Sequence, residues 1–226
     1  MIGIIGAMQV EIEGLKKSMT DVSTEVVSGV TFYSGKLAGK DVVAAVSGVG
    51  KVFAAICAEA MILHFHADHL INIGVAGSVT DKLKVLDVAL ATAVVQHDMN
   101  TTAIGDPLGL ISGINKVELP ADEQMTKIMS DAMDELGIKH ENGIIASGDL
   151  FVDTPAQRAK IAERFDAIAA EMEGASIGHV CYVNRVPFTI IRSISDAEGS
   201  SMDFATFAEK AAEQSIRIVI KGLERL

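Results

Sequence analysis

Acidic side chains in this sequence stand where α/β proteins usually perform chemistry. Two acids fall in the block Glu-Met-Glu-Gly at 171–174, where an apolar strand pattern changes to a helical one. Asp196 closes the block Arg-Ser-Ile-Ser-Asp at 192–196, at the end of the next apolar stretch, and Glu11 follows the first. Ligands bind outside the carboxyl ends of strands in open α/β sheets, so these acids are candidates for a functional site.

Each acid also has a structural explanation, which the sequence leaves open. Glu11 and Glu173 could simply complement the dipole at the start of a helix. Glu13 is the same residue type as its neighbour Glu11, so position alone does not single Glu11 out. Arg192 and Asp196 could form only a local ion pair.

Alternating strand and helix patterns must position these residues. Their short connections predict a single α/β domain over residues 1–226, with three layers in α/β/α order and a mixed central sheet. Residues 97–118 hold Gly, Asn, Pro and Ser and are predicted to form a long loop, which is usually a lid or an interface. The expected strands are 2–7, 25–33, 41–47, 70–73, 85–95, 143–147, 167–170 and 187–193. The expected helices are 9–18, 51–65, 125–136, 155–165, 174–184 and 204–223.

Composition excludes several classes of function. The formal charge is -11, from 19 basic and 30 acidic residues without a basic run, which argues against nucleic-acid binding. No stretch reaches the ~18 apolar residues of a membrane span. The N-terminus lacks the basic leader of a signal peptide, and the two cysteines have no CxxC spacing, so we expect a cytoplasmic protein.

Most of the ten methionines should fill the core, although Met8 or Met172 could line an apolar ligand pocket.

Two motifs invite cofactor or metal assignments that their spacing does not support. The run Gly-Val-Gly-Lys at 48–51 lacks the third glycine of a dinucleotide fingerprint and the Ser or Thr of a P-loop. It predicts a tight turn whose backbone approaches a small ligand. His64, His66 and His69 could hold a metal, but they span a helix end and the following loop and need not converge. We expect no metal site and no cofactor.

The segment after residue 147 offers two readings. Ser147, Gly148 and Asp149 end a strand, and Phe151 and Val152 follow. In one reading this is a turn with Phe151 in the core. In the other, Phe151 offers a flat ring to a flat ligand and the backbone of Val152 binds the ligand's edge. The pair His97-Asp98 is expected to be loop structure rather than a catalytic pair.

Taken in order, these blocks resemble one family nearly from end to end. The residues concerned are 3–8 with Glu11, the Gly-Val-Ala-Gly run at 74–77, 147–149, 171–173 and 192–196. They resemble the bacterial 5′-methylthioadenosine/S-adenosylhomocysteine nucleosidases of the nucleoside phosphorylase superfamily. The last two blocks, at this spacing, are the specific part.

The resemblance implies a nucleoside phosphorylase-like fold and hydrolysis of the N-glycosidic bond of 5′-methylthioadenosine and S-adenosylhomocysteine. Adenine and the thioribose product would be released with no metal or organic cofactor. 5′-Deoxyadenosine and aminodeoxyfutalosine are further candidate substrates. The loop residues 97–100 and 107–109 look like those of members that accept aminodeoxyfutalosine.

The same resemblance implies a separate role for each acid. Asp196 protonates adenine N7, which requires a raised pKa, and Ser195 orients it. Glu11 activates the attacking water, while Arg192 holds this water and keeps Glu11 ionised. Glu173 binds the ribose hydroxyls, and its charge stabilises the oxocarbenium-like sugar.

The remaining pocket residues also come from the resemblance. Phe151 stacks on adenine, Val152 binds its edge through the backbone, and Met172 lies against the sugar. The family forms homodimers in which the neighbouring subunit closes the 5′ pocket, here through Thr101, Ile104 and Leu110. Ile104 and Val75 depart from the family, which often has an aromatic residue and a Ser there. The other expected pocket residues are Met8, Val49, Val75, Ala76, Gly77 and Phe204.

Two rival functions remain at this stage. A phosphorylase of the same superfamily would need cationic or hydroxyl donors for phosphate, which a Glu at position 11 would repel. A non-catalytic nucleoside-binding module could share the fold, since a fold does not determine function. The presence of all three acids argues against the second rival.

Overall fold

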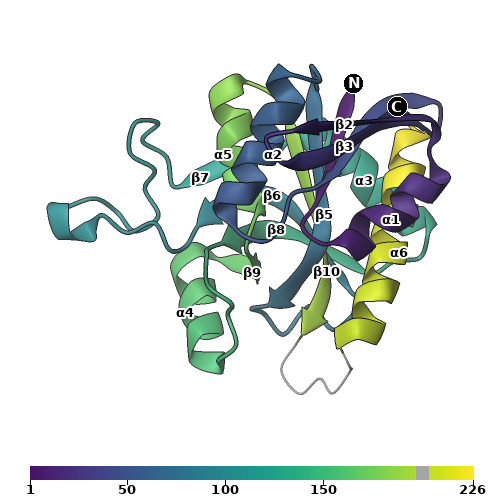
Figure 1. The fold of residues 1–226 in the computed structure, drawn as a ribbon. Helices are drawn as coiled ribbons and strands as arrows, with labels where there is room; N and C mark the ends of the chain where they lie inside the picture. The colour runs from purple at the N-terminus through teal and green to yellow at the C-terminus, as the bar shows by residue number, and fades with distance from the viewer. Residues whose placement is uncertain (197–203) are drawn as a thin grey trace.

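One mixed sheet forms the centre of the molecule (Figure 1). The computed structural model describes the backbone of residues 1–196 and 204–226, and the side chains there except those of 196, 204–206 and 208. The strands are β1 (Ile2–Gly6), β2 (Thr20–Val27), β3 (Val30–Leu37), β4 (Lys40–Val46), β5 (His69–Ser78), β6 (Val88–Gln96), β7 (Glu118–Pro120), β8 (His140–Ser147), β9 (Ala167–Glu171) and β10 (Phe188–Asp196). The helices are α1 (Gln9–Ser18), α2 (Lys51–Leu63), the 3-10 turn η1 (Thr102–Ile104), α3 (Glu123–Glu135), α4 (Pro155–Phe165), α5 (Gly174–Asn184) and α6 (Phe204–Leu223).

The strand pairing gathers several carboxyl ends at one place. β4, β1, β5 and β10 are parallel neighbours in that order, so their carboxyl ends share one edge. β10 continues to β6, β8 and β9, and β9 pairs back onto the end of β5, which closes five strands into a ring. β2 and β3 extend the other side of the sheet as antiparallel strands. The predicted mixed sheet is confirmed.

Helices cover both faces of this sheet. α1, α3 and α6 pack together on one face, and α2 and α5 pack together on the other. The neighbours Ile4 and Ile5 show the division, because both are fully buried and they belong to different apolar clusters. Successive residues of a strand point to opposite faces, so the uninterrupted apolar run of β1 marks a strand covered on both sides. The three-layer expectation is therefore confirmed.

The expected strand at 25–33 is wrong. A turn at Ser28-Gly29, with φ of +52° and +79°, divides this segment into β2 and β3. Ser-Gly is a turn signal that the apolar residues around it concealed. β2 is exposed along nearly its whole length, so no pattern of buried residues marked it.

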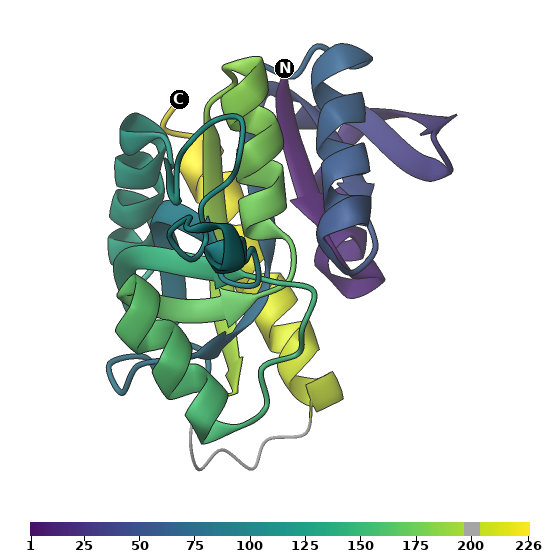
Figure 2. The same ribbon diagram turned by 90° about the vertical axis from the view of Figure 1, so that its left-hand side faces the viewer.

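One further boundary bears on the site. The Gly-Val-Ala-Gly run at 74–77 lies inside β5 and not after it, since β5 continues to Ser78. The long loop is confirmed between β6 and β7, the latter a short strand that was not expected, and it carries the turn η1. It extends from the body of the fold in Figure 1 and points toward the viewer in Figure 2. No helix among the described residues is long and apolar enough to cross a membrane.

Candidate active site

Glu11 is held in the first turn of α1, directly after β1. The side chain is buried, and its Oε2 accepts hydrogen bonds from the backbone amides of Ala7 and Met8 at 2.7 and 2.9 Å. Gly6 makes this possible, because a Cβ there would stand 2.9 Å from the Cβ of Glu11. Burial raises the pKa of Glu11, while the charge of Arg192 and the two amides oppose the rise.

Arg192 lies in β10 with its side chain 1% exposed, which is rare for a guanidinium. Its Nη2 donates to Oδ1 of Asn72 at 2.5 Å, to Glu171, and to Oε2 of Glu173 at 3.4 Å. Burial works against the charged form, but the charges of Glu171, Glu173 and Glu11 outweigh it and raise the pKa of Arg192. The guanidinium is thus a fixed positive charge among carboxylates.

Glu173 precedes α5 and reaches back to the turn at 48–51. Its Oε1 accepts a hydrogen bond from the amide of Gly50 at 2.9 Å. Gly48 and Gly50 have φ of +91° and +99°, which confirms the predicted tight turn. Burial raises the pKa of Glu173 to about 7, with a further contribution from the charge of Glu171. This carboxyl therefore exchanges its proton near neutral pH.

Three residues in this cluster received no role from the sequence. Glu171 ends β9 beside Glu173 and is buried against Arg192. Asn72 and Ser147 are fully buried polar residues in β5 and β8. A lone amide within the apolar run 70–73 was the available signal for Asn72, since an unpaired amide is costly inside a core.

The arrangement places three carboxylates around one guanidinium among the described residues. Glu11, Glu171 and Glu173 all act on the pKa of Arg192, and burial shields the group from water. A site with surplus negative charge stabilises a developing cation far better than water does. A buried carboxyl with a raised pKa can also take up a proton near neutral pH. Chemistry through a cationic transition state fits this geometry.

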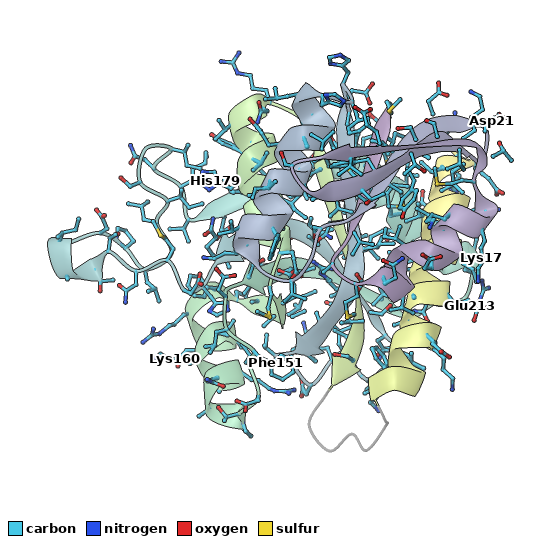
Figure 3. All side chains as sticks on the ribbon, in the orientation of Figure 1. Lys17, Asp21, Phe151, Lys160, His179 and Glu213 are labelled. Carbon is cyan, nitrogen blue, oxygen red and sulfur yellow. The ribbon has the colours of Figure 1, made fainter. Side chains whose placement is uncertain are left out.

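Phe151 is not a core residue. It lies on the segment between β8 and α4, and 68% of its surface is exposed, so the core reading is wrong (Figure 3). Val152 is half-buried against the small apolar cluster under α4. An exposed ring beside the strand ends is free to stack on a planar ligand. Val49, in the turn before α2, is also exposed.

The other expected contact residues lie on the same strand ends. Met8 caps α1 and Met172 connects β9 to α5, both half-buried. Ser195 Oγ donates to the carbonyl of Ala76 at 3.3 Å, which ties β10 to β5. Val75 and Gly77 belong to this part of β5, and Gly77 pairs with Ala170 and with the backbone of Asp196.

Two expected residues lie outside the described side chains. The backbone of Asp196 ends β10 and that of Phe204 begins α6. Their side chains are not described, so their predicted contacts stay predictions.

The loop residues do not join this site within one chain. Ile104 sits on η1 with 80% of its surface exposed, on the part of the loop that extends from the fold (Figure 1). Thr101 precedes η1, and Leu110 follows it, half-buried. Their predicted role requires a second chain.

The histidines of the 64–69 segment face different partners. His64 Nε2 lies 2.8 Å from a carboxylate oxygen of Glu25, and His69 Nε2 lies 3.2 Å from the hydroxyl of Thr189. Nowhere in the described part of the chain do three metal-binding side chains gather. Asp98 pairs with Lys51 at 2.7 Å and accepts the amide of Asp149.

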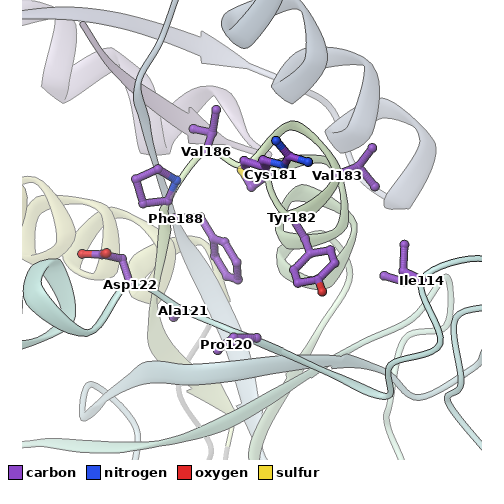
Figure 4. Close-up of a pocket in the computed structure, with 11 residues that line it drawn as sticks. Ile114, Pro120, Ala121, Asp122, Cys181, Tyr182, Val183, Val186 and Phe188 are labelled. Atoms are coloured by element: carbon purple, nitrogen blue, oxygen red, sulfur yellow. The ribbon is translucent and has the colours of Figure 1, made fainter.

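A cavity of about 760 Å³ lies away from the acids, at the opposite end of β10 (Figure 4). Tyr182 and Phe188 line it, with Asp122 at its side. Phe188 begins β10 whereas Asp196 ends it. None of the predicted site residues lines this cavity.

Comparison with known proteins gives a consistent result over the whole chain. Residues 1–224 match the phosphorylase superfamily. The chain is 39% identical to the 5′-methylthioadenosine/S-adenosylhomocysteine nucleosidase of Shewanella frigidimarina, covering 100% of this chain and 99% of that protein. It is 38% identical to the aminodeoxyfutalosine nucleosidase of Campylobacter jejuni, with the same coverage. A solved 5′-methylthioadenosine/S-adenosylhomocysteine nucleosidase from Campylobacter jejuni, also 38% identical, superimposes with a TM-score of 0.95 over 100% of this chain and 99% of that one.

Proposed function

Because this chain belongs to the phosphorylase superfamily and matches its nucleosidases from end to end, we propose that it works through a water molecule activated by Glu11. The chain is a nucleosidase, a hydrolase of the N-glycosidic bond of 5′-methylthioadenosine and S-adenosylhomocysteine. The bond between C1′ and N9 breaks, the water oxygen bonds to C1′, and adenine leaves with one added proton. The observation that carries this proposal is the buried Glu11 facing Arg192.

Glu11 is suited to activate water. Its Oε2 is fixed by two backbone amides, which leaves Oε1 on the side of Gly74 and Arg192. Burial raises the pKa of Glu11 and makes it a stronger base once ionised. The guanidinium of Arg192 holds the water beside it and stabilises the ionised carboxylate. The proton that the water loses passes to Glu11.

Asp196 supplies the proton that adenine N7 takes up as the bond breaks. Its backbone pairs with Gly77 at the end of the ring of strands, and this position supports the proposal. Ser195, whose hydroxyl contacts the carbonyl of Ala76, orients Asp196. A neutral adenine leaves far more readily than its anion, which is why an acid is needed there.

Glu173 binds the ribose hydroxyls in this proposal. Its carboxyl is fixed by the amide of Gly50 and buried. A hydroxyl donates to this carboxylate, and the negative charge stabilises the sugar as it becomes cationic.

The remaining pocket residues contact the sugar and the base. Met172 lies under the sugar. Phe151 stacks on adenine and the backbone of Val152 binds its edge, with Met8, Val49 and Phe204 completing the pocket.

A homodimer completes the 5′ end of the pocket in this proposal. α2 and α5 present a groove of about 1060 Å³, and apolar side chains such as Val52 and Val183 stand exposed beside it, at 69% and 60%. Exposed apolar surface of this kind favours association. Thr101, Ile104 and Leu110, on the extended loop, would then reach the pocket of the partner.

We also propose that the protein works in the cytoplasm. Cys57 and Cys181 are free and buried, and burial raises the pKa of the Cys57 thiol to about 12. Thiols without disulfide partners suit the reducing cytoplasm. There a single catalytic domain of residues 1–226 would serve methionine salvage by removing adenine from spent nucleosides.

The substrate range extends to aminodeoxyfutalosine and 5′-deoxyadenosine in this proposal. The relative from Campylobacter jejuni that is named for aminodeoxyfutalosine supports the first of these. Adenine release from all four nucleosides, measured side by side in phosphate-free buffer, tests the range.

The same assay decides between hydrolysis and phosphorolysis. The donors on Nη2 of Arg192 are taken by Asn72, Glu171 and Glu173, and the surrounding carboxylates repel an anion. We therefore expect full turnover without phosphate, and strict phosphate dependence would overturn the hydrolase proposal. Binding of 5′-methylthioadenosine without any adenine release would favour the non-catalytic module.

A further inference from the structure

Two buried side chains fix the orientation of Arg192. Asn72 and Glu171 both accept from its Nη2, and neither is exposed by more than 7%. A guanidinium is planar and rigid, so fixing one terminal nitrogen together with the β10 backbone fixes the direction of the other. The orientation of Nη1 is therefore set through Nη2, by Asn72 and Glu171.

Nη1 lies near Glu11. A Cβ at Gly74 would collide with Nη1 and would lie 3.0 Å from Oε1 of Glu11. Nη1 and this oxygen thus both border the space that Gly74 leaves open. Any rotation of the guanidinium would change its electrostatic interaction with Glu11 and with the water beside Glu11.

Asn72 has its own orientation fixed by the sheet. Its Nδ2 donates to the carbonyl of Ile5 at 2.8 Å and to that of Ile73 at 3.4 Å. Because the amide nitrogen is held by these carbonyls, Oδ1 must point the other way, toward Arg192. The position of Nη2 is thereby tied to β1 and β5.

Glu171 connects Arg192 with Glu173. Besides Arg192, its carboxylate accepts the backbone amides of Glu173 at 3.1 Å and of Gly174 at 2.8 Å. Ser147 donates to the same carboxylate and accepts the amide of Ala175 at 2.7 Å. One carboxylate thus fixes the backbone that carries Glu173 and the cation that faces Glu11.

We propose that Asn72 and Glu171 are positioning residues for the reaction, holding Arg192 toward Glu11 and fixing Glu173 under the ribose. The proposal rests on the function proposed above. The structural alternative is that Glu171 serves only to cap α5, as Ser147 does.

Glu171→Gln separates the two roles, because Gln keeps the shape and removes the charge. We measure kcat and KM for 5′-methylthioadenosine from pH 5 to 9 in phosphate-free buffer, with circular dichroism and Tm as controls for folding. We expect kcat to fall about 100-fold, the loss typical of a misplaced catalytic group, while KM changes less than about threefold. The charge of Glu171 contributes to the raised pKa of Glu11. Removing this charge should therefore also move the acidic limb of the profile of kcat/KM against pH to lower pH.

Ser147→Ala is the matched control. It removes a cap on α5 and leaves the charge of Glu171 in place, so its Tm should fall and its acidic limb should stay at the wild-type pH. If Glu171 only caps α5, both variants will lower Tm and neither will lower kcat. A folded Glu171→Gln enzyme with wild-type kcat overturns the proposal, whether or not the limb moves.

Glu171→Asp covers the case in which Glu171→Gln does not fold. The shorter carboxylate keeps the charge but cannot reach both Arg192 and the α5 amides. We expect a similar fall in kcat with the acidic limb unmoved, and wild-type kcat would overturn the proposal. The wild-type enzyme is assayed first, and a lack of adenine release there would overturn the proposed function instead.

Discussion

The guanidinium of Arg192 occupies the space that Gly74 leaves open, since a Cβ at position 74 would collide with Nη1. β5 and β10 are parallel neighbours, and Arg192 is directly paired with Gly74 in their register. A side chain on β10 can therefore lie across β5 only because its partner has none. Oε1 of Glu11 borders the same opening.

Gly74→Ala should displace Arg192 and reduce activity. We expect kcat to fall about 100-fold, because the cation moves away from Glu11. Steady-state adenine release, with urea unfolding as the measure of stability, checks this. Gly39→Ala is the control: nothing lies within 4 Å of a Cβ there, and its φ is +78°. It should lose about 1 kcal/mol of stability and keep its kcat, and an equal loss of kcat in both variants would contradict the prediction.

Glu11→Gln should lower kcat about 1000-fold, because the amide cannot accept a proton from water. KM should change little, since Gln keeps the shape of the side chain. Glu13→Gln is the matched control: Glu13 is two residues further along α1 and pairs with Lys16 on the surface. It should have wild-type kcat. Equal rates for the two variants would remove Glu11 from the mechanism.

Glu173 should make the unliganded protein less stable as the pH rises. Its pKa is raised from an ordinary carboxyl value to about 7 in the folded state, so folding favours its protonated form. The stability linked to this proton is complete below the unfolded pKa and is lost as the pH rises through about 7. Urea unfolding at pH 5 and pH 8 should show a loss on the order of 2 kcal/mol in wild type that Glu173→Gln lacks. Equal losses in both proteins would show that other groups cause it.

Val52→Glu should dissociate the proposed dimer, because it places a charge beside the α2–α5 groove. Val52 is 69% exposed, so the fold itself should tolerate the change. We expect sedimentation at half the wild-type mass and roughly a tenfold rise in KM for 5′-methylthioadenosine, the usual effect of losing an apolar contact. Val26→Glu, at a site 65% exposed on β2 and outside the groove, should behave as wild type. A Val52→Glu protein of unchanged mass would contradict this interface.

The sequence predicted which acids lie near Arg192 better than it predicted the interactions among them. Glu11, Glu173 and Arg192 could be located because strand ends are visible in the apolar pattern. The roles of Asn72 and Glu171 could not be found this way, since they depend on contacts between residues 120 and 21 positions apart in the chain. β2 and β3 were merged because an exposed edge strand carries no pattern of buried residues. For Phe151 the sequence left two readings open, and its exposed ring excludes the one that places it in the core.

The burial of Arg192 also determines how this enzyme responds to dissolved ions. Salt weakens attractions between charges that its ions can approach, such as the exposed pair of Lys36 and Asp41. Arg192 and its carboxylates are buried, so salt screens the interactions among them much less. The electric field at the reacting sugar is consequently far less sensitive to ionic strength than the ion pairs on the protein surface are.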